Sequence, residues 1–473
     1  MLAGFAGAPG IQVPSRAGRK TNVVFFLTDD HGAWSMGAYG CPEFHTPNVD
    51  RLAAGGAMFS RAHAATPVCS PSRMTYLTGK LPAGHGVHDA VVAVDCWGPQ
   101  RRRFLEGHAT YSQVLAKNGY TLGMCGKWHM GDDDNAHAGF SYWCTKAQAG
   151  GGYRDPTLVK NGSRVKIEGF LTDAQVDAGL EFLDGNKDRP FFLYVPFYAP
   201  HTSYSYQPER DRQWYAGSKF SCFPQPPKHP QRRRSFEPHH GSRQSMTAYS
   251  ALVSGVDHNV GRIVQRLEDL GLRENTLLVF SADQGWNAGH HGVWGKGNAT
   301  IPFNMYEEST RVPLIWNQPG KIRAGQTISP MVSSYDFFPT ILDYLGVTAP
   351  GRDPQRVGRS YAGFLRGENL PWRNELYFEY CYTRAVRTEN LKYVERADNW
   401  PSELYDLEAD PVEDLNVIGW PPYRERLAAM QGKLRSFFRT SGAPPIEKWH
   451  DSVRNVLTVD IGYYDNWLKL PSK

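Results

Sequence analysis

Apolar runs of strand length recur along most of the chain and alternate with segments of helical periodicity. The runs are continuously hydrophobic, as strands are when both faces of their sheet are covered. Helices between such strands are typical of α/β proteins, so the pattern predicts a large mixed, mostly parallel sheet flanked by helices. The five runs are residues 21–28, 121–125, 191–198, 276–282 and 312–316.

Helix signals lie between these runs. Thr46 followed by Pro47 predicts a helix with proline in its first turn. Thr172 and Gln175 have the spacing of a capping box. Residues 248–271 carry apolar positions at helical intervals, which predicts one long amphipathic helix.

The character of the sequence changes twice. Residues 208–245 are rich in Pro, Arg and His, and we interpret them as a long surface insertion. After about residue 370, residues 375–395 are typical of antiparallel strands and residues 423–440 of one amphipathic helix. Because one core stops growing near roughly 250–300 residues, we expect a large domain at 20–370 and a small C-terminal α+β domain at 371–473.

Composition narrows the class of protein. Hydrophobic residues make up 41% of the 473 residues and charged residues 21%, as in globular proteins. The net charge of +5 gives no support for a nucleic-acid partner. No apolar run approaches the roughly 20 residues that span a bilayer, so we expect no membrane span.

Localisation stays open. Residues 1–20 lack a charged start and a continuous apolar stretch, so we expect a secretory signal to be absent or already removed. The protein is periplasmic or secreted if a signal was trimmed, and otherwise cytoplasmic. Seven cysteines without a close CxxC pair argue against a dense disulfide framework or a zinc ribbon, and their odd number leaves at least one unpaired.

Acidic side chains follow two of the predicted strands. Asp29 and Asp30 come directly after the run 21–28, and Asp283 and Gln284 after the run 276–282. Open α/β sheets bind ligands at the carboxyl ends of their strands. One Asp of an isolated pair could merely cap a helix, but the second pair favours a cation site. Three carboxylates and an amide suit calcium or magnesium and do not suit zinc.

Cys69 lies where another helix is predicted to begin. Pro71 and Arg73 follow it, so Cys69 would face backbone N–H groups and a guanidinium, a place for a nucleophile or an anion. A thiolate is a poor ligand for a hard cation, so an oxygen would fit this place better. The alternative is a buried free cysteine with no chemical role.

Cationic and titratable side chains follow further strands. Lys127 and His129 come after the run 121–125, and His201 after the run 191–198. Taken singly, each could be a solvated loop residue. Together they map to the edge that carries the carboxylates, and such a pocket would bind a tetrahedral oxyanion between a metal and several cations. The glycine-rich segment 289–298 adds three more cationic or titratable side chains: His290, His291 and Lys296.

At this point the sequence resembles the type I, formylglycine-dependent sulfatases of the alkaline phosphatase superfamily. The family motif C-x-P-S-R is present as Cys69, Ser70, Pro71, Ser72 and Arg73, followed by Leu77, Thr78 and Gly79. The resemblance implies an alkaline-phosphatase-like fold in which residues 20–370 are the catalytic domain. Further matching segments are residues 26–31, 46–59, 126–129, 199–201, 281–285, 308–315 and 403–416.

The resemblance implies a sulfuric ester hydrolase with two special components. A formylglycine-generating maturation enzyme would oxidise Cys69 to formylglycine (3-oxoalanine), whose hydrated aldehyde is an oxygen nucleophile. One Ca²⁺ would be held by residue 69 together with Asp29, Asp30, Asp283 and Gln284. Gln284 replaces the Asn that is more frequent in the family, but its amide oxygen should still reach the ion.

The resemblance also implies roles for the cationic residues. Arg73 would hold the diol and Lys127 would neutralise sulfate oxygens. His129 would remove a proton from the sulfated diol, which expels sulfate and restores the aldehyde. His201 and Lys296 would bind the sulfate, and either could protonate the departing alcohol.

The substrate is predicted to be a sulfated carbohydrate, because tryptophans and polar side chains together suit a sugar ring. The alternative is that both tryptophans pack the loop down. The insertion 208–245 could form a rim for a polyanionic glycan or stay solvated. The candidate sugar-binding residues, all on one loop that resembles those of bacterial carbohydrate sulfatases, are Trp286, Asn287, His290, His291 and Trp294.

Two other functions remain open. An arylsulfatase or a phosphate or phosphonate monoester hydrolase would use the same fold, although the intact Ser-Pro-Ser-Arg after Cys69 favours sulfate. A non-catalytic protein that binds sulfated glycans with an unmodified Cys69 is the alternative of another class. A response of stability to calcium would argue against it.

Overall fold

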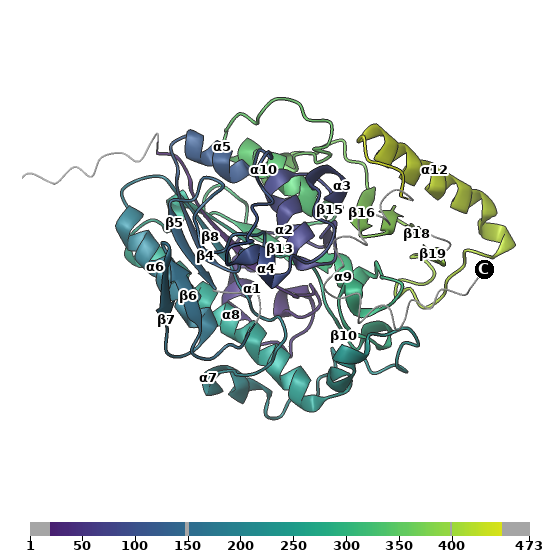
Figure 1. Cartoon of the computed structure of the whole chain (residues 1–473), viewed down its shortest axis with the longest axis horizontal. Helices are drawn as coiled ribbons and strands as arrows, with labels where there is room; N and C mark the ends of the chain where they lie inside the picture. Colours follow the sequence, from purple (N-terminus) through teal and green to yellow (C-terminus); the bar gives the residue numbers. More distant parts are fainter. Residues whose placement is uncertain (1–18, 147–150, 398–399, 447–473) are drawn as a thin grey trace, which may run out of the picture.

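A ten-stranded mixed sheet lies between two layers of helices (Figure 1), as the apolar runs predicted. The computed structural model describes residues 19–146, 151–397 and 400–446, so most of the segment 1–20 and the end of the expected C-terminal domain, 447–473, lie outside the described residues. The strand order is β14 (Gln326–Ile328), β2 (Ala57–Phe59), β13 (Leu314–Asn317), β9 (Thr276–Ala282), β1 (Asn22–Thr28), β8 (Phe191–Pro196), β4 (Thr121–Gly126), β5 (Tyr142–Lys146), β6 (Thr157–Lys160) and β7 (Ser163–Lys166).

The central strands run parallel. β1 pairs in parallel with β8 and β9, and β4 pairs in parallel with β8 and β5. β13, β6 and β7 join their neighbours in antiparallel fashion, which makes the sheet mixed. The carboxyl ends of β1, β9, β8, β4 and β5 therefore meet at one edge, where such sheets place their ligands.

Alternate side chains of β1 explain why both faces of the sheet are covered. Val23, Phe25 and Leu27 enter one core and Val24 and Phe26 enter the other, and all five are fully buried. The first core is closed by α2 (Cys69–Thr78), α5 (Tyr111–Lys117), α10 (Phe337–Tyr344) and α11 (Ala362–Leu365), and the second by α1 (Pro47–Ala54), α6 (Leu171–Asn186) and α8 (Arg243–Asp269).

One of the two predicted helix starts is confirmed and the other is not. α1 begins at Pro47 after Thr46, as expected. The prediction of a capping box at Thr172 is wrong: α6 starts at Leu171 with Phe170 as its N-cap. The Thr172 side chain is buried and has no hydrogen-bond partner among the described residues. A β-bridge between Arg154 and Phe170 and the bond from Leu171 N–H to Tyr153 O set this helix entry instead.

A four-stranded antiparallel sheet and one helix form the C-terminal part, at the right of Figure 1. This agrees with the α+β pattern predicted after residue 370, while the domain boundary itself stays a prediction. The elements are β16 (Leu376–Tyr380), β17 (Thr383–Arg387), β18 (Leu391–Arg396), β19 (Glu403–Asp406) and α12 (Arg424–Thr440), which packs on β17 and β18.

The segment expected to be a surface insertion contributes to a core. It contains α7 (Glu209–Arg212), and its Tyr215, Phe220 and Phe223 are buried with the loop that carries Trp286 and Trp294. α8 already starts at Arg243, inside the expected 208–245 range. Within the described ranges, no helix is both long enough and apolar enough to cross a membrane.

One disulfide ties the segment 208–245 to the chain near the N-terminal end of α1. Cys41 and Cys222 are bonded across a sequence separation of 181 residues, with their Cα atoms 6.3 Å apart. The carboxylate of Glu43 accepts hydrogen bonds from the hydroxyls of Ser218 and Ser221 at the same place. The other cysteines are unpaired and buried, which confirms the expectation of at least one free thiol; they are Cys69, Cys96, Cys125, Cys144 and Cys381.

Candidate active site

The acidic residues predicted to hold a metal lie side by side. Asp29 and Asp30 follow β1, Asp283 and Gln284 follow β9, and the register that pairs Thr28 with Ala282 brings the two strand ends together. All four side chains are buried. Gln284 Nε2 lies 2.6 Å from Asp30 Oδ1 and 3.4 Å from Asp29 Oδ1, so the two strand ends are joined through this amide.

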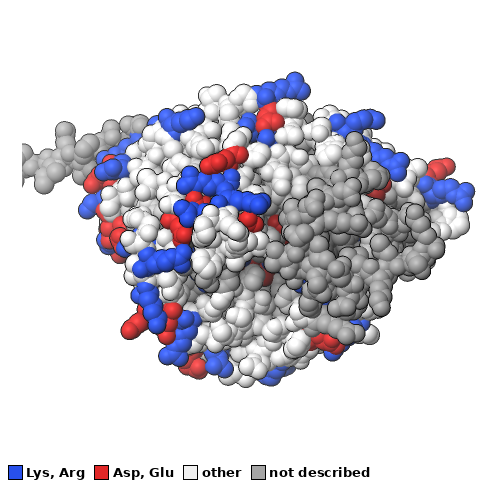
Figure 2. Space-filling model, in the orientation of Figure 1, with Lys and Arg blue, Asp and Glu red and all other residues white. Residues whose placement is uncertain are grey.

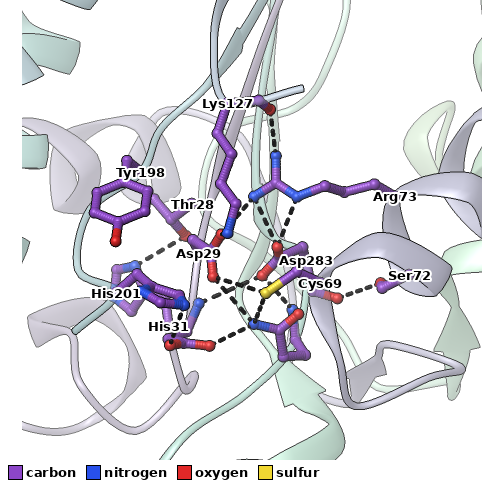
Figure 3. A network of polar contacts seen from close by, with 12 residues as sticks. Thr28, Asp29, His31, Cys69, Ser72, Arg73, Lys127, Tyr198, His201 and Asp283 are labelled. Atoms are coloured by element: carbon purple, nitrogen blue, oxygen red, sulfur yellow. Dashed lines mark hydrogen bonds and ion pairs between the residues drawn. The ribbon is translucent and has the colours of Figure 1, made fainter. Parts of the chain in front are cut away.

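Cys69 is the first residue of α2 and points at these carboxylates (Figure 3). Its Sγ lies 3.3 Å from Asp29 Oδ1 and 2.8 Å from Lys296 Nζ. The hydroxyl of Ser72 donates to the carbonyl of Asp283, which fixes the start of α2 against the end of β9. The residue is only 2% exposed, so its surroundings are set by the protein.

Arg73 joins three parts of the site in Figure 3. Its guanidinium contacts Asp29 Oδ2 at 2.9 Å and Asp283 Oδ2 at 2.7 Å, and its Nη1 donates to the carbonyl of Lys127 at 2.7 Å. The side chain is fully buried. Through these contacts the buried guanidinium holds the ends of β1, β9 and β4 in one geometry.

Two lysines complete the charge balance. Lys127, after β4, contacts Asp29 Oδ2 at 2.6 Å, and Lys296 contacts Asp30 Oδ1 at 2.5 Å. Asn304 donates to the carbonyl of Lys296 at 3.1 Å and so holds its loop. Three buried cations therefore face three buried carboxylates, because Arg73 stands opposite Asp283.

These charges shift the pKa values of the acidic groups in opposite directions. Burial would raise the pKa of Asp29, but Lys127, His201 and Arg73 hold it well below its usual value. Burial raises the pKa of Asp30 in spite of Lys296. Burial and the neighbouring Asp29 raise the pKa of Asp283 well above its usual value.

The Cys69 thiol is acidified by its surroundings. Burial and Asp29 would raise its pKa, but Lys127 and Lys296 prevail and lower it to about 6. A negatively charged or strongly polarised atom at residue 69 is therefore stabilised by two ammonium groups. This is the electrostatic setting that an oxygen nucleophile or a bound oxyanion needs.

The two histidines of the predicted machinery reach the site from different strands. His129 Nε2 lies 2.9 Å from the carbonyl of Val91, so Nε2 carries the hydrogen and Nδ1 is left as a buried acceptor without a partner among the described residues. Burial, then Lys127 and Arg73, lower the pKa of His129 well below its usual value. His201 Nε2 lies 3.8 Å from Asp30 Oδ2.

The donor set fits a hard cation. Asp30 Oδ2 and Gln284 Oε1 are buried and have no hydrogen-bond partner among the described residues. Ligand atoms of Asp29, Cys69 and His201 lie within 4.8 Å of one another. Rotation of the Gln284 side-chain amide would exchange the positions of Oε1 and Nε2. Oε1 would then face the carboxylates and could bind the same cation as they do. Carboxylate and amide oxygens are the ligands that calcium and magnesium prefer, and they suit zinc less well.

The predicted sugar-binding loop is arranged differently from the expectation. Trp286 is 1% exposed and Trp294 is 2% exposed, so neither offers a ring face to a ligand. Trp294 Nε1 donates to the hydroxyl of Tyr204 at 3.0 Å, and Asn287 Nδ2 donates to Ser309 Oγ at 2.6 Å. These contacts favour the alternative interpretation, in which the side chains of the loop pack against the protein. The aromatic residues of the segment 208–245 cover the loop.

The two histidines of this loop are half-buried. His291 Nε2 lies 2.8 Å from Glu308 Oε2, and the His291 ring stacks on Tyr306 at a centroid distance of 3.8 Å. The ring of His290 lies 4.8 Å from that of Trp34. Each is thus held by protein neighbours, and a role in binding sugar stays a prediction.

Two residues that the sequence analysis did not name lie beside the site. The Tyr198 ring has Lys127 Nζ 5.4 Å from its centroid and Lys146 Nζ 5.0 Å from it. Lys146 ends β5, a strand absent from the five predicted runs. The apolar stretch Tyr142, Trp143 and Cys144 before it was the available signal.

Comparison with known proteins decides the family. Residues 21–347 match the family model described as sulfatase. The chain belongs to the sulfatase family. Residues 289–439 also match the model of the C-terminal part of N-sulphoglucosamine sulphohydrolase. This sulfatase is accordingly a sulfuric ester hydrolase, of a family whose members in general use formylglycine and calcium.

Relatives and solved structures agree with this assignment. The chain is 28% identical to the N-acetylglucosamine-6-O-sulfatase of Bacteroides thetaiotaomicron over 86% of its own length and 84% of the relative's. It is 28% identical to human arylsulfatase A, with 85% and 84% covered. A structure of a protein in complex with its substrate D-glucosamine-2-N,6-O-disulfate superposes with a TM-score of 0.77 at 26% identity, covering 91% of this chain and 100% of the other.

A likeness to a phosphonate monoester hydrolase of Agrobacterium radiobacter shows the fold alone. That structure has a TM-score of 0.70 at 21% identity, with 89% of this chain and 96% of the other covered. The phosphonate hydrolase therefore shares the arrangement of the sheet and helices, and its activity is not carried over to this sulfatase.

Proposed function

We propose that this sulfatase removes sulfate from a sulfated carbohydrate, with calcium bound and with Cys69 converted to formylglycine. The observation that carries the proposal is the position of Cys69 between Asp29 Oδ1 at 3.3 Å and Lys296 Nζ at 2.8 Å. A thiolate would be a poor neighbour for a hard cation, whereas an oxygen at residue 69 fits it. The first relative named above acts on a 6-sulfated amino sugar, which supports a carbohydrate substrate.

Calcium and formylglycine would each have a distinct role at this site. Calcium would be held by Asp29, Asp30, Asp283 and Gln284 and would add positive charge beside the sulfate oxygens. Formylglycine at residue 69 would supply a hydroxyl nucleophile.

The protein's own side chains account for the proton transfers. Arg73 orients residue 69, because it is fixed by Asp29, Asp283 and the carbonyl of Lys127. His129 Nδ1 is free to accept a proton, because its Nε2 already donates to Val91.

His201 and Lys296 are placed to bind the sulfate. His201 Nε2 lies 3.8 Å from Asp30 Oδ2 and Lys296 Nζ lies 2.5 Å from Asp30 Oδ1. Either group would donate a proton to the leaving alcohol. Lys127, paired with Asp29 at 2.6 Å, adds a positive charge for the sulfate oxygens. The proposed base, His129, follows β4 and the candidate acid His201 follows β8, so separate groups are available for the two proton transfers.

The test is a mass measurement paired with an activity measurement. Protein is produced with and without a formylglycine-generating enzyme, and the tryptic peptide that contains residue 69 is weighed. Conversion replaces the thiol sulfur and two hydrogens with one oxygen. We expect this change only with the maturation enzyme, together with calcium-dependent sulfate release from an aryl sulfate.

Two outcomes would contradict the proposal. An unmodified thiol in protein that nevertheless binds sulfated glycans would favour a non-catalytic binding protein. Faster release of phosphate from an aryl phosphate than of sulfate from the matching aryl sulfate would favour a phosphate monoester hydrolase. The Cys69→Ala variant, with its fold checked by circular dichroism, is the control for both assays, because it lacks the convertible thiol.

We also propose that the protein works in an oxidising compartment, as a periplasmic or secreted enzyme. The disulfide between Cys41 and Cys222 supports this, because such bonds persist outside the reducing cytosol. Fractionation of the native host, with the thiols blocked at lysis, tests it. The enzyme should be found outside the cytosol with both cysteines unavailable to the blocking reagent, and a reduced cytosolic protein would contradict the proposal.

A further inference from the structure

Two consecutive hydrogen bonds link the start of α2 to the ring of His129. The hydroxyl of Ser70 accepts a hydrogen bond from the backbone N–H of Val91 at 2.9 Å. The carbonyl of the same Val91 accepts a hydrogen bond from His129 Nε2, also at 2.9 Å. Both backbone groups of Val91 are therefore in use, one to fix the residue on α2 and the other to hold the imidazole.

These contacts are shielded from water. Ser70 is fully buried, and Val91 and His129 are each 8% exposed. A buried backbone group that loses its partner is costly, so the Ser70 hydroxyl and the Val91 backbone fix each other's positions. On the described part of the face shown in Figure 2, acidic and basic side chains are mixed, so the surface imposes no field of one sign that could orient the ring instead.

The segment 88–91 is held by the C-terminal sheet as well. Asp89 Oδ1 accepts a hydrogen bond at 2.8 Å from the hydroxyl of Tyr380, the last residue of β16. In the turn that follows, the N–H of Cys381 donates to the carbonyl of His88 at 3.3 Å. The segment is thus fixed before its last residue reaches the active site, and the serine hydroxyl on α2 fixes that last residue.

His129 occupies a conformation that its surroundings must maintain. Its φ is 58°, in the left-handed region that residues other than glycine seldom adopt, and such a conformation persists where neighbouring contacts hold it. Burial, then Lys127 and Arg73, lower the pKa of His129, while Asp29 acts in the opposite direction, so the ring is neutral and lies among the groups of the site. A neutral imidazole carries one hydrogen, and the bond to Val91 places it on Nε2.

We propose that Ser70 is a positioning residue for the base His129: by fixing Val91, it keeps the ring hydrogen on Nε2 and leaves Nδ1 as the acceptor in the site. The inference rests on the proposed sulfatase activity and on the proposed role of His129 in it. It gives a function to position 70, which the motif C-x-P-S-R leaves open. Without the fixed carbonyl either ring nitrogen can carry the hydrogen, and a ring with its hydrogen on Nδ1 cannot accept a proton there.

The tautomer of His129 tests the inference without any turnover. Protein with unconverted Cys69 is isotope-labelled in its histidine side chains for nuclear magnetic resonance, and the His129 signals are identified by their absence from a His129→Gln variant. Nitrogen chemical shifts distinguish a ring nitrogen that carries hydrogen from one that does not. At neutral pH we expect the unaltered protein to show only the Nε2–H tautomer and the Ser70→Ala variant to show a mixture of both tautomers.

Steady-state kinetics of the converted enzyme give a second readout. In the proposed hydrolysis His129 acts after the alcohol has left, and kcat/KM reports only the steps up to that departure. For Ser70→Ala we expect kcat with an aryl sulfate to fall at least about tenfold, while kcat/KM stays within about twofold of its original value. A burst of aryl alcohol should then precede the steady state, because the second step has become limiting.

Two further variants separate the hydroxyl from packing. Ser70→Thr keeps a hydroxyl at this position and should restore the single tautomer and most of kcat. Ser254→Ala removes another buried serine hydroxyl, which lies on α8 and contacts the hydroxyl of Tyr215, and should leave both readouts unchanged. The mass of the peptide that contains residue 69 is measured for each variant, so that equally converted enzymes are compared.

Three results would overturn the inference: a single Nε2–H tautomer in Ser70→Ala, a fall in kcat/KM as large as the fall in kcat, or no recovery in a folded Ser70→Thr variant. Failure of the inference alone would leave sulfate release by the unaltered enzyme intact. Failure of the proposed function would remove that release, whereas the tautomer measurement would still report on the role of Ser70.

Discussion

Lys296 Nζ lies 2.8 Å from Cys69 Sγ and 2.5 Å from Asp30 Oδ1, so one ammonium group bridges the nucleophile position and a predicted metal ligand. Both partners precede Lys296 by more than two hundred residues in the sequence. We predict that Lys296→Met lowers kcat for sulfate release at least about a hundredfold, because a preorganised positive charge at the reacting group is lost.

Steady-state kinetics of the converted enzyme measure this effect. Lys321→Met, at an exposed lysine outside the site, is the control and should keep its kcat. Circular dichroism of both variants checks that they fold. A Lys296→Met enzyme with full kcat would remove Lys296 from the catalytic machinery.

Calcium should stabilise the fold through the carboxylates of the site. A ligand that binds only the native state adds about 2.7 kcal/mol at a concentration of one hundred times its Kd. We therefore expect the melting temperature to fall after chelation and to recover with Ca²⁺. In the Asp30→Asn variant this response should be lost, and in Asp353→Asn, at a half-buried residue of a distant ion pair with Lys80, it should persist. Identical responses in both variants would place the ion elsewhere.

A buried lysine joins the C-terminal sheet to the catalytic part. Lys392 Nζ on β18 lies 2.7 Å from Glu307 Oε1 and 2.7 Å from Glu413 Oε1, and its side chain is fully buried. Removing one partner of a buried ion pair leaves the other uncompensated, which typically costs about 3–5 kcal/mol. We predict this loss of unfolding free energy for Lys392→Met, measured by urea denaturation.

Lys433→Met provides the comparison for that measurement. Lys433 is 42% exposed and pairs with Glu375 on the surface, where an ion pair contributes about 0–1 kcal/mol. Equal losses in the two variants would show that the buried network does not carry the stability of the C-terminal part.

The disulfide between Cys41 and Cys222 should stabilise the segment 208–245, which packs on the loop that leads to Lys296. Bonds that close long loops contribute about 2–4 kcal/mol, and Cys41 and Cys222 are 181 residues apart. Replacing both by Ala should lower the melting temperature, and a reducing agent should lower it in the unaltered protein but not in the double variant. A further drop in the double variant on reduction would point to another disulfide.

Much of the fold followed from the sequence. Continuous apolar runs such as residues 22–28 bury both faces, and this property requires a covered, mostly parallel sheet. Because parallel strands end at one edge, the position of Asp29, Asp283, Lys127 and His201 directly after strands was sufficient to predict that they meet. The motif at Cys69 supplied the family and, with it, the roles proposed for these residues.

Other features depended on contacts between distant segments. Trp286 and Trp294 were predicted to bind sugar, but Tyr215, Phe220 and Phe223 cover their loop. The sequence of a loop does not indicate which distant segment packs on it. The pairing of Cys41 with Cys222 likewise follows only from the folded chain, because spacing does not determine connectivity.

The sequence by itself determined the sheet, the family and the residue types at the site, because strand periodicity and a contiguous motif are local properties. Only the tertiary structure decided which charges pair, which aromatic side chains are buried and where Lys146 lies. These depend on the register between β4 and β5 and on the ring of Tyr198, which lies 52 residues further along the chain than Lys146.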